Sequence, residues 1–215
     1  MRRTTATKCR TASLEPWEWR YDEDPTEEPP YTDSVRFKPY DGQMSTALLL
    51  IDVQRNMLED PQPVPGAAGI RTALERLLET ARRCGAVIVH VQNSGSQGDP
   101  DEPGIAGWEL LFEPMAGEMV IQKTQPDTFA SNPELEGELK QLDVSRLVVA
   151  GMQSNYCVAA TSRAGLQRGF EVLLASGAHA TYDEDKPASA ISSDVEGDLA
   201  KEGVVVIPAA DVSFD

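Results

Sequence analysis

The sequence predicts an α/β fold in which a mostly parallel, doubly wound six-stranded sheet carries helices on both faces, giving three layers. From residue 46 onward, apolar segments of strand length alternate with longer segments of helical periodicity. The apolar residues of these strands are continuous rather than alternating, which indicates that both strand faces are covered. Strands that alternate with helices favour right-handed crossovers and therefore a parallel sheet.

Six segments are predicted as strands. They are residues 47–53, 86–91, 119–121, 147–150, 172–175 and 204–207. The third is the weakest, because its apolar run is the shortest. Ligands of doubly wound sheets bind beyond the carboxyl ends of the strands, so the residues that follow each strand are the first candidates for a site.

Four segments between the strands are predicted as helices. They are residues 68–84, 133–142, 156–168 and about 186–202. Asn132 is expected to cap the second, with Pro133 at its first position. Gly169 and Gly203 stand where helix C-termini are expected, a position that favours glycine.

Residues 1–43 differ in composition from the rest of the chain. They are rich in proline, poor in aliphatic residues and acidic from residue 22 to 28, so they predict an N-terminal arm that is extended or partly disordered. Residues 44–215 form the predicted folded domain. Two interpretations stay open: the aromatic residues of the arm dock on the domain or on a neighbouring subunit, or Met44 is the true start and the arm is dispensable.

Charge and composition narrow the classes of partner. The 215 residues carry 19 Lys and Arg against 35 Asp and Glu, a net charge of −16. This charge excludes nucleic acid and an anionic membrane surface as expected partners, and no run of 18 apolar residues predicts a membrane span. We therefore expect a cytoplasmic protein that acts on a small-molecule substrate.

Three reactive side chains follow predicted strands. Asp52 ends the first strand, Lys123 follows the third, and Cys157 follows the fourth, at the first turn of a predicted helix. The partial positive charge of a helix N-terminus favours thiolate over thiol, so Cys157 is a candidate nucleophile. A base, a cation and a thiol at one sheet edge predict a nucleophilic hydrolase site.

Four motifs together resemble the isochorismatase-like cysteine hydrolases, a family of nicotinamidases, carbamoylsarcosine and ureidoacrylate amidohydrolases, and isochorismatases. They are Leu49-Leu50-Ile51-Asp52-Val53-Gln54, Lys123 with Pro126-Asp127-Thr128-Phe129, the run from Val148 to Val158 with Gly151-Met152-Gln153 at its centre, and Ser176-Gly177-Ala178-His179-Ala180-Thr181. The resemblance spans about residues 46–207.

The resemblance implies a catalytic triad of Asp52, Lys123 and Cys157. It also implies a non-proline cis peptide after Met152 and an oxyanion hole formed by the backbone N–H groups of Gln153 and Cys157. The implied reaction is hydrolysis of a small carboxamide, ureido or carbamoyl substrate through a Cys157 thioester, with no cofactor, in a dimer or tetramer. Two alternatives remain: vinyl-ether hydrolysis of the isochorismatase type, and a catalytically idle binding module.

Nearness to the strand ends predicts six substrate-binding residues. They are Gln54, Gln92, Asn93, Trp108, Phe129 and Tyr156. Amide side chains among aromatic ones suit a small polar amide. Phe129 and Trp108 are equally compatible with core positions. Met57 stands where nicotinamidases have an aromatic residue, which argues against that activity.

The two histidines do not predict a metal site. His90 lies within an apolar strand and is interpreted as a hydrogen-bonded core or pocket-wall residue, while His179 follows the fifth strand and is assigned a structural role. No Asp-x-His pair is present, so the ligands of a zinc site are missing. We therefore expect no metal.

Overall fold

The computed structural model describes residues 45–214, and the predicted arm at residues 1–43 lies outside the described residues. The predicted α/β fold is confirmed. Six parallel strands form one sheet in the order β3-β2-β1-β4-β5-β6. The strands are β1 (Ser45–Ile51), β2 (Val87–Asn93), β3 (Met119–Lys123), β4 (Val144–Met152), β5 (Glu171–Ala180) and β6 (Val205–Pro208).

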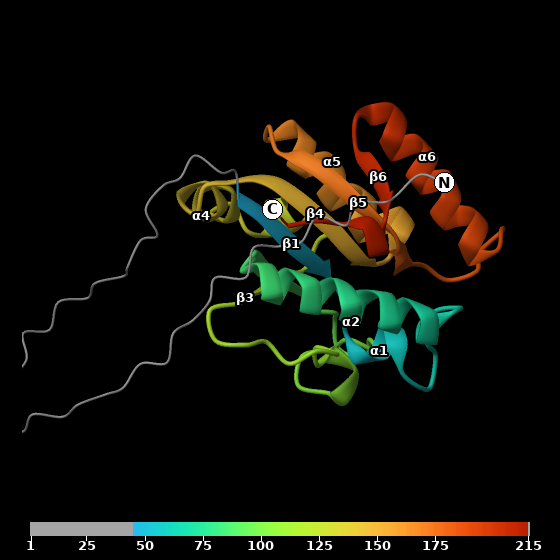
Figure 1. Ribbon diagram of the computed structural model, residues 1–215. Helices are drawn as coiled ribbons and strands as arrows, with labels where there is room; N and C mark the ends of the chain where they lie inside the picture. The colour runs from blue at the N-terminus through green and yellow to red at the C-terminus, as the bar shows by residue number, and fades with distance from the viewer. Residues whose placement is uncertain (1–44, 215) are drawn as a thin grey trace, which may run out of the picture. The chain divides into compact units, whose positions relative to one another are not determined.

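Helices cover both faces of the sheet, as Figure 1 shows. Their bounds are α1 (Arg55–Leu58), α2 (Ala67–Cys84), α3 (Thr128–Ser131), α4 (Leu135–Gln141), α5 (Ala159–Gln167) and α6 (Ala188–Glu202). Short turns add the 3₁₀ helices η1 (Ala106–Trp108) and η3 (Ala209–Asp211) and the π-helical turn η2 (Ser154–Val158). None of the helices in residues 45–214 is long and apolar enough to span a membrane.

Strand β1 separates two hydrophobic cores. Its side chains alternate between them: Leu49 packs with residues of α3, α4, α5 and α6, whereas Leu48 and Leu50 pack with α1, α2 and the C-terminal segment. Both sets are fully buried, which explains the continuous apolar pattern of this strand. Any movement of β1 would therefore require both hydrophobic cores to repack, so the residue that follows this strand is held in a fixed position.

The second and third predicted helices differ from the structure. Residues 128–131 form α3, and α4 begins at Leu135, so the prediction that Asn132 caps the second helix is wrong. The Asn132 side-chain amide instead donates to the carbonyls of Thr128 and Gln122. Residues 154–158 form a π-helical turn before α5. The expected helix ends at Gly169 and Gly203 are confirmed, with φ angles of 83° and 109°.

The strand order places a crevice between β1 and β4. The chain runs outward from β1 to β2 and β3, and then returns to the other side of β1 to form β4, so the connections diverge at this point. Ligands of open α/β sheets bind at such a switch point, beyond the carboxyl ends of the strands. Asp52 follows β1 and η2 follows β4, so both segments border the crevice.

Candidate active site

Strands β3, β1 and β4 deliver the predicted reactive residues to one edge of the sheet, and β2 lies between the first two of them. Lys123 is the last residue of β3 and pairs in register with Asn93 at the end of β2. Asp52 follows β1 with a φ of 49°, in the left-handed region that a side chain rarely adopts. Cys157 lies in η2, one short turn after β4. Parallel strands thus bring Lys123 and Cys157 into contact, although the two residues are 34 positions apart in the sequence.

The ammonium group of Lys123 joins the three side chains. Its Nζ lies 2.9 Å from Asp52 Oδ2 and 3.2 Å from Cys157 Sγ, and it donates a third hydrogen bond to Asn93 Oδ1 at 3.0 Å. Lys123 is only 1% exposed and Asp52 only 2%. All three ammonium protons therefore have acceptors, as a buried lysine requires.

Burial raises the pKa of both acidic groups, and the charge of Lys123 opposes this rise in each case. Loss of solvent raises the pKa of Asp52 above its usual range, and the interaction with Lys123 only partly offsets this. Loss of solvent also raises the pKa of Cys157 to about 11, and the Asp52 carboxylate adds to the rise while Lys123 opposes it. The expectation that the helix N-terminus makes Cys157 a thiolate is therefore wrong for the resting site, because desolvation and the adjacent carboxylate favour the protonated thiol.

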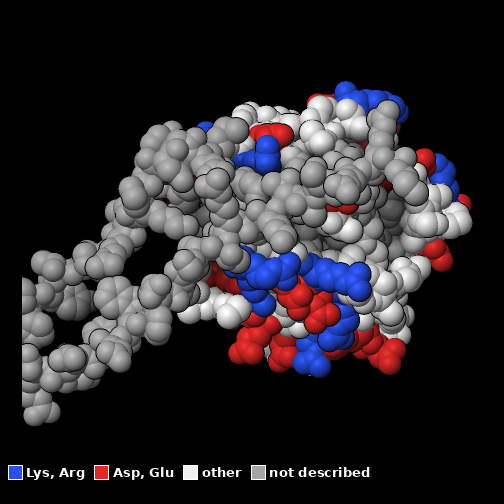
Figure 2. Space-filling view, viewed as in Figure 1, with Lys and Arg blue, Asp and Glu red and all other residues white. Residues whose placement is uncertain are grey.

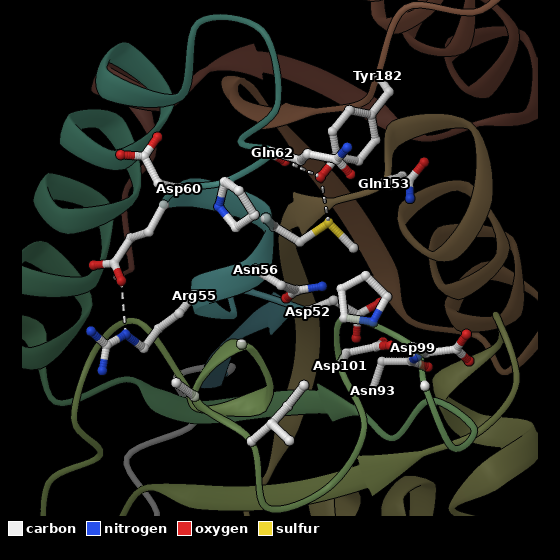
Figure 3. A pocket seen from close by; sticks show the side chains of 18 of the residues that line it. Asp52, Arg55, Asn56, Asp60, Gln62, Asn93, Asp99, Asp101, Gln153 and Tyr182 are labelled. Atoms are coloured by element: carbon white, nitrogen blue, oxygen red, sulfur yellow. Dashed lines mark hydrogen bonds and ion pairs between the residues drawn. The ribbon is translucent and has the colours of Figure 1, made fainter.

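A cavity of about 910 Å³ opens above Cys157 and Asp52. Figure 3 shows Asp52 and Asn93 close together, with Gln153 and Tyr182 on another side of the space. Lys123 does not line the cavity and lies beneath these residues. Asp52 Oδ1 is buried and makes no hydrogen bond of regular geometry within residues 45–214. The cluster thus combines a solvent-reachable thiol with a carboxylate that keeps one oxygen available.

The chain bends sharply between β4 and η2. The peptide bond from Met152 to Gln153 is cis, the non-proline bond that the family resemblance implies. Gly151 has a φ of 120°, and a side chain there would collide with the backbone of Ile51 on β1. Only glycine therefore permits β4 to approach β1 this closely before the turn that carries Cys157.

A polar chain outside the cavity lining anchors the same turn. Ser154 Oγ lies 2.8 Å from His179 Nδ1 and 3.0 Å from Ser192 Oγ, and His179 Nε2 lies 3.0 Å from Glu196 Oε1. The hydrogen bond with His179 contributes most to lowering the pKa of Glu196. The chain ties η2 to β5 and α6, which agrees with the structural role assigned to His179.

Of the six predicted substrate-binding residues, only Asn93 lines the cavity. The amides of Gln54 and Gln92 are buried, and each Nε2 donates to the Trp108 carbonyl, at 2.9 and 2.7 Å. Gln54 also exchanges hydrogen bonds with the backbone of Asn93. These two glutamines therefore hold the loop after β2 in place. Their side-chain amides bind the backbone of that loop rather than the substrate that the prediction assigned to them.

The three predicted aromatic residues lie outside the cavity lining. Phe129 is 1% exposed and stacks on Phe170 in the core, at 6.1 Å between ring centroids. Trp108 is part of η1, and its indole N–H points to Ser94 Oγ at 3.4 Å. Tyr156 is 50% exposed. The exposed Tyr156 ring is therefore outside the cavity lining, although its neighbour Cys157 is part of that lining.

Sequence reasoning missed the acidic lining of the cavity. Four acidic residues besides Asp52 contribute, from the segment after α1 and from the loop between β2 and β3: Glu59, Asp60, Asp99 and Asp101. None of them follows a strand directly, so the strand-end rule does not point to them. The only sequence signal is the acidic run at residues 99–102. Within residues 45–214, no group of three or more His, Cys, Asp or Glu side chains is arranged to hold a metal ion.

The fold and this buried cluster define an α/β protein with an acid, an amine and a thiol in contact at the switch point of its sheet. Residues 46–211 match the isochorismatase domain, and the chain belongs to the isochorismatase family of hydrolases.

Known relatives agree with this assignment. Two streptothricin hydrolases from Streptomyces noursei are each 40% identical over 178 residues, covering 78% of this chain and 70% and 64% of their own lengths. A ureidoacrylate amidohydrolase from Variovorax paradoxus is 27% identical over 148 residues, covering 54% of this chain and 58% of the relative. The crystal structure of an isochorismatase from Pseudomonas putida KT2440 superposes with a TM-score of 0.72 at 30% identity, covering 78% of this chain and 90% of that one.

Proposed function

We propose that this protein is an amidohydrolase that cleaves a small carboxamide, ureido or carbamoyl compound through a Cys157 thioester. The single observation that carries the proposal is the contact of Lys123 Nζ with both Asp52 Oδ2 and Cys157 Sγ at the base of the cavity. The names of two groups of relatives, streptothricin hydrolase and ureidoacrylate amidohydrolase, support hydrolysis as the reaction and an amide-type bond as its target.

The raised pKa values of the two acidic groups fit a proton transfer between them. In the resting site the thiol holds its proton chiefly because burial raises its pKa to about 11, and the nearby Asp52 carboxylate adds to the rise. When the thiol proton moves to Asp52, the thiolate forms beside the Lys123 ammonium, 3.2 Å away. Asp52 binds the proton more readily than an exposed aspartate, because its pKa is raised by burial. The site thus forms its nucleophile at the moment of attack.

Each later step uses the same groups. The thiolate attacks the substrate carbonyl carbon, and the backbone N–H groups of Gln153 and Cys157 are the proposed donors to the developing oxyanion. The carbon–nitrogen bond then breaks as Asp52 returns its proton to the leaving nitrogen. Asp52, again a carboxylate, takes a proton from water, which attacks the thioester carbon. The carbon–sulfur bond then breaks, the acid is released, and the Cys157 thiolate takes the proton back from Asp52.

The test compares the wild type with Cys157→Ala on a panel of carboxamide, ureido and carbamoyl compounds, with ammonia or amine release as the readout. The proposal expects release by the wild type only, and intact-protein mass spectrometry after rapid acid quenching should detect an acyl adduct on Cys157. The matched control is Ser162→Ala, a buried change in α5 outside the cavity, which should retain activity. Equal release by the wild type and Cys157→Ala contradicts the proposal.

A further inference from the structure

The cavity lining is strongly anionic. Its charged side chains are one guanidinium and five carboxylates, namely Arg55 and Asp52, Glu59, Asp60, Asp99 and Asp101. Two carboxylates are neutralised, because Asp52 pairs with Lys123 and Glu59 pairs with Arg55 at 2.7 Å. Asp60, Asp99 and Asp101 have no ion-pair partner among residues 45–214. Figure 2 shows further acidic side chains along the lower edge of the molecule, interspersed with basic ones.

Two of the unpaired carboxylates adjoin the reactive cluster. Asp101 Oδ2 accepts a hydrogen bond of 2.6 Å from Asn93 Nδ2, and the other end of the same amide accepts one from Lys123. Figure 3 shows Asp99 and Asp101 together next to Asn93 and Asp52. The charge of Asp101 also contributes to raising the pKa of Asp52. Asp101 therefore acts directly on the reactive cluster, and Asp99 lines the same cavity beside it.

A second, independent observation concerns unused hydrogen-bond acceptors. Asn56 lines the same cavity, and its buried Oδ1 has no hydrogen-bond donor within the described residues. Asp52 is only 2% exposed, and its Oδ1 accepts no hydrogen bond of regular geometry there, although the carboxylate also interacts with the Cys157 thiol. A buried acceptor without a partner is costly, so Asn56 Oδ1 calls for an N–H or O–H group from a ligand, and Asp52 Oδ1 has room to accept one beside the thiol.

We propose that the substrate is a cation, with an ammonium or guanidinium group held by Asp99 and Asp101 while its amide carbon reaches Cys157. This inference rests on the proposed function and specifies its substrate class. A positive group satisfies the unpaired carboxylates and supplies N–H donors to the free acceptors. A carboxylate-bearing substrate meets repulsion from the same two residues, so anionic amides are poor substrates.

Thiol reagents of different charge test the cavity without knowledge of the substrate. The probes are three methanethiosulfonates: the cationic 2-(trimethylammonio)ethyl reagent, the anionic 2-sulfonatoethyl reagent and the neutral methyl reagent. In each case the Cys157 thiolate attacks the sulfenyl sulfur, a mixed disulfide forms, and methanesulfinate leaves with the electron pair of the broken bond. Intact-protein mass spectrometry measures the rate, and Cys157→Ala identifies labelling at other cysteines.

The expected result is a cation-over-neutral rate ratio of about tenfold in the wild type, with a ratio below one for the anionic reagent. The double variant Asp99→Asn, Asp101→Asn should bring both ratios close to one. Because the neutral reagent normalises each rate, a change in thiol reactivity cancels. The matched control Glu134→Gln, Glu138→Gln removes two exposed carboxylates from the region of α4 and should keep the wild-type ratios.

The possible outcomes separate this inference from the proposed function. Equal rates for the cationic and neutral reagents in the wild type overturn the inference, and so does an unchanged ratio in the Asp99, Asp101 double variant. Both leave the proposed nucleophile intact. If no reagent adds mass at Cys157, the cavity lacks an accessible nucleophile, and the proposed function fails together with the inference.

Discussion

Two buried polar clusters border β2 and differ in how completely their hydrogen bonds are satisfied. In the first, Glu118 accepts from Arg82 at 2.7 and 2.9 Å, from the backbone of Met115 and from His90. In the second, Asp52 Oδ2 contacts Lys123 and the carboxylate interacts with the Cys157 thiol, while Oδ1 accepts no hydrogen bond of regular geometry within the described residues. Neither His90 nor Glu118 lines the cavity.

The pKa values follow this difference. Burial alone would raise the pKa of Glu118, but hydrogen bonds from Arg82, Met115 and His90 outweigh it and lower the pKa to about 2. Burial dominates at Asp52 and Cys157, so both pKa values rise. The Glu118 cluster therefore favours a fixed charge and stabilises the fold, while the Asp52 cluster leaves a proton free to move between two groups.

Removing the Asp52 charge tests this contrast with the largest expected effect. Asp52→Asn removes the general base, so we expect turnover to fall by on the order of 10²–10⁴-fold. The same change removes a negative charge that raises the Cys157 pKa, so alkylation by iodoacetamide at pH 8 should become faster. Turnover and thiol reactivity thus move in opposite directions, which a general loss of structure does not produce.

Asp60→Asn is the matched control for this experiment. Asp60 also lines the cavity, but it is exposed and forms no ion pair within the described residues. The rate of Cys157 alkylation in Asp60→Asn should stay close to that of the wild type. Slower alkylation of Cys157 in Asp52→Asn would contradict the assignment of Asp52 as the group that holds the thiol in its protonated form.

Glu118→Gln tests the other cluster and should change stability rather than turnover. We expect a loss of about 1–3 kcal/mol in the free energy of unfolding at pH 7, because Arg82 loses a charged partner. Glu118 has a lower pKa in the folded state than its ordinary value of 4.5, so its contribution is complete above that value. It is lost as the pH falls from 4.5 toward 2.

Urea denaturation at pH 7 and pH 3 measures this difference. The gap between wild type and Glu118→Gln should be smaller at pH 3. Glu171→Gln, which breaks an ion pair with Arg146 on the surface, is the control and should alter stability by less than about 1 kcal/mol. If Glu118→Gln lowers kcat under conditions in which the variant is fully folded, the Glu118 cluster also affects catalysis and the proposed division between the two clusters is wrong.

The same contrast explains what could be predicted from the sequence. The strands and the meeting of Asp52, Lys123 and Cys157 follow from local apolar runs, because parallel strands place the residues after them at one edge. The burial of Glu118 and the acidic lining depend on the loop between β2 and β3. Long-range contacts fix its path, among them the bridge from Gln54 to Leu110 and the bond from the Leu111 N–H to the Val53 carbonyl.

The pKa of Cys157 was mispredicted for a related reason. A helix N-terminus is visible in the sequence, whereas the depth of the thiol and the orientation of the Asp52 carboxylate are properties of the assembled site. Phe129 shows the same limit: it follows a strand, as a pocket residue would, but it turns into the core against Phe170. Position after a strand predicts which residues reach the edge, and packing decides which of them face the cavity.

The smallest expected effect sharpens the comparison within the site. If the Asp52 carboxylate is the base, kcat/KM should rise with pH through the raised pKa of Asp52, and the acid limb should lie above the ordinary aspartate value of 3.8. The charge of Asp101 contributes to that rise. Asp101→Asn removes this charge, which makes the Asp52 carboxylate easier to form, so the acid limb should move to lower pH.

The measurement is a pH profile of kcat/KM for the wild type, Asp101→Asn and Asp60→Asn on one neutral amide from the panel. A neutral substrate keeps its own charge constant, so the shift reports on Asp52 rather than on binding of a cation. Asp60 does not contribute to the pKa shift of Asp52, so its variant should keep the wild-type limb. Removal of a nearby negative charge must lower the pKa of an interacting carboxyl group. If the acid limb of Asp101→Asn does not move, the ionisation that sets this limb therefore belongs to a group other than Asp52.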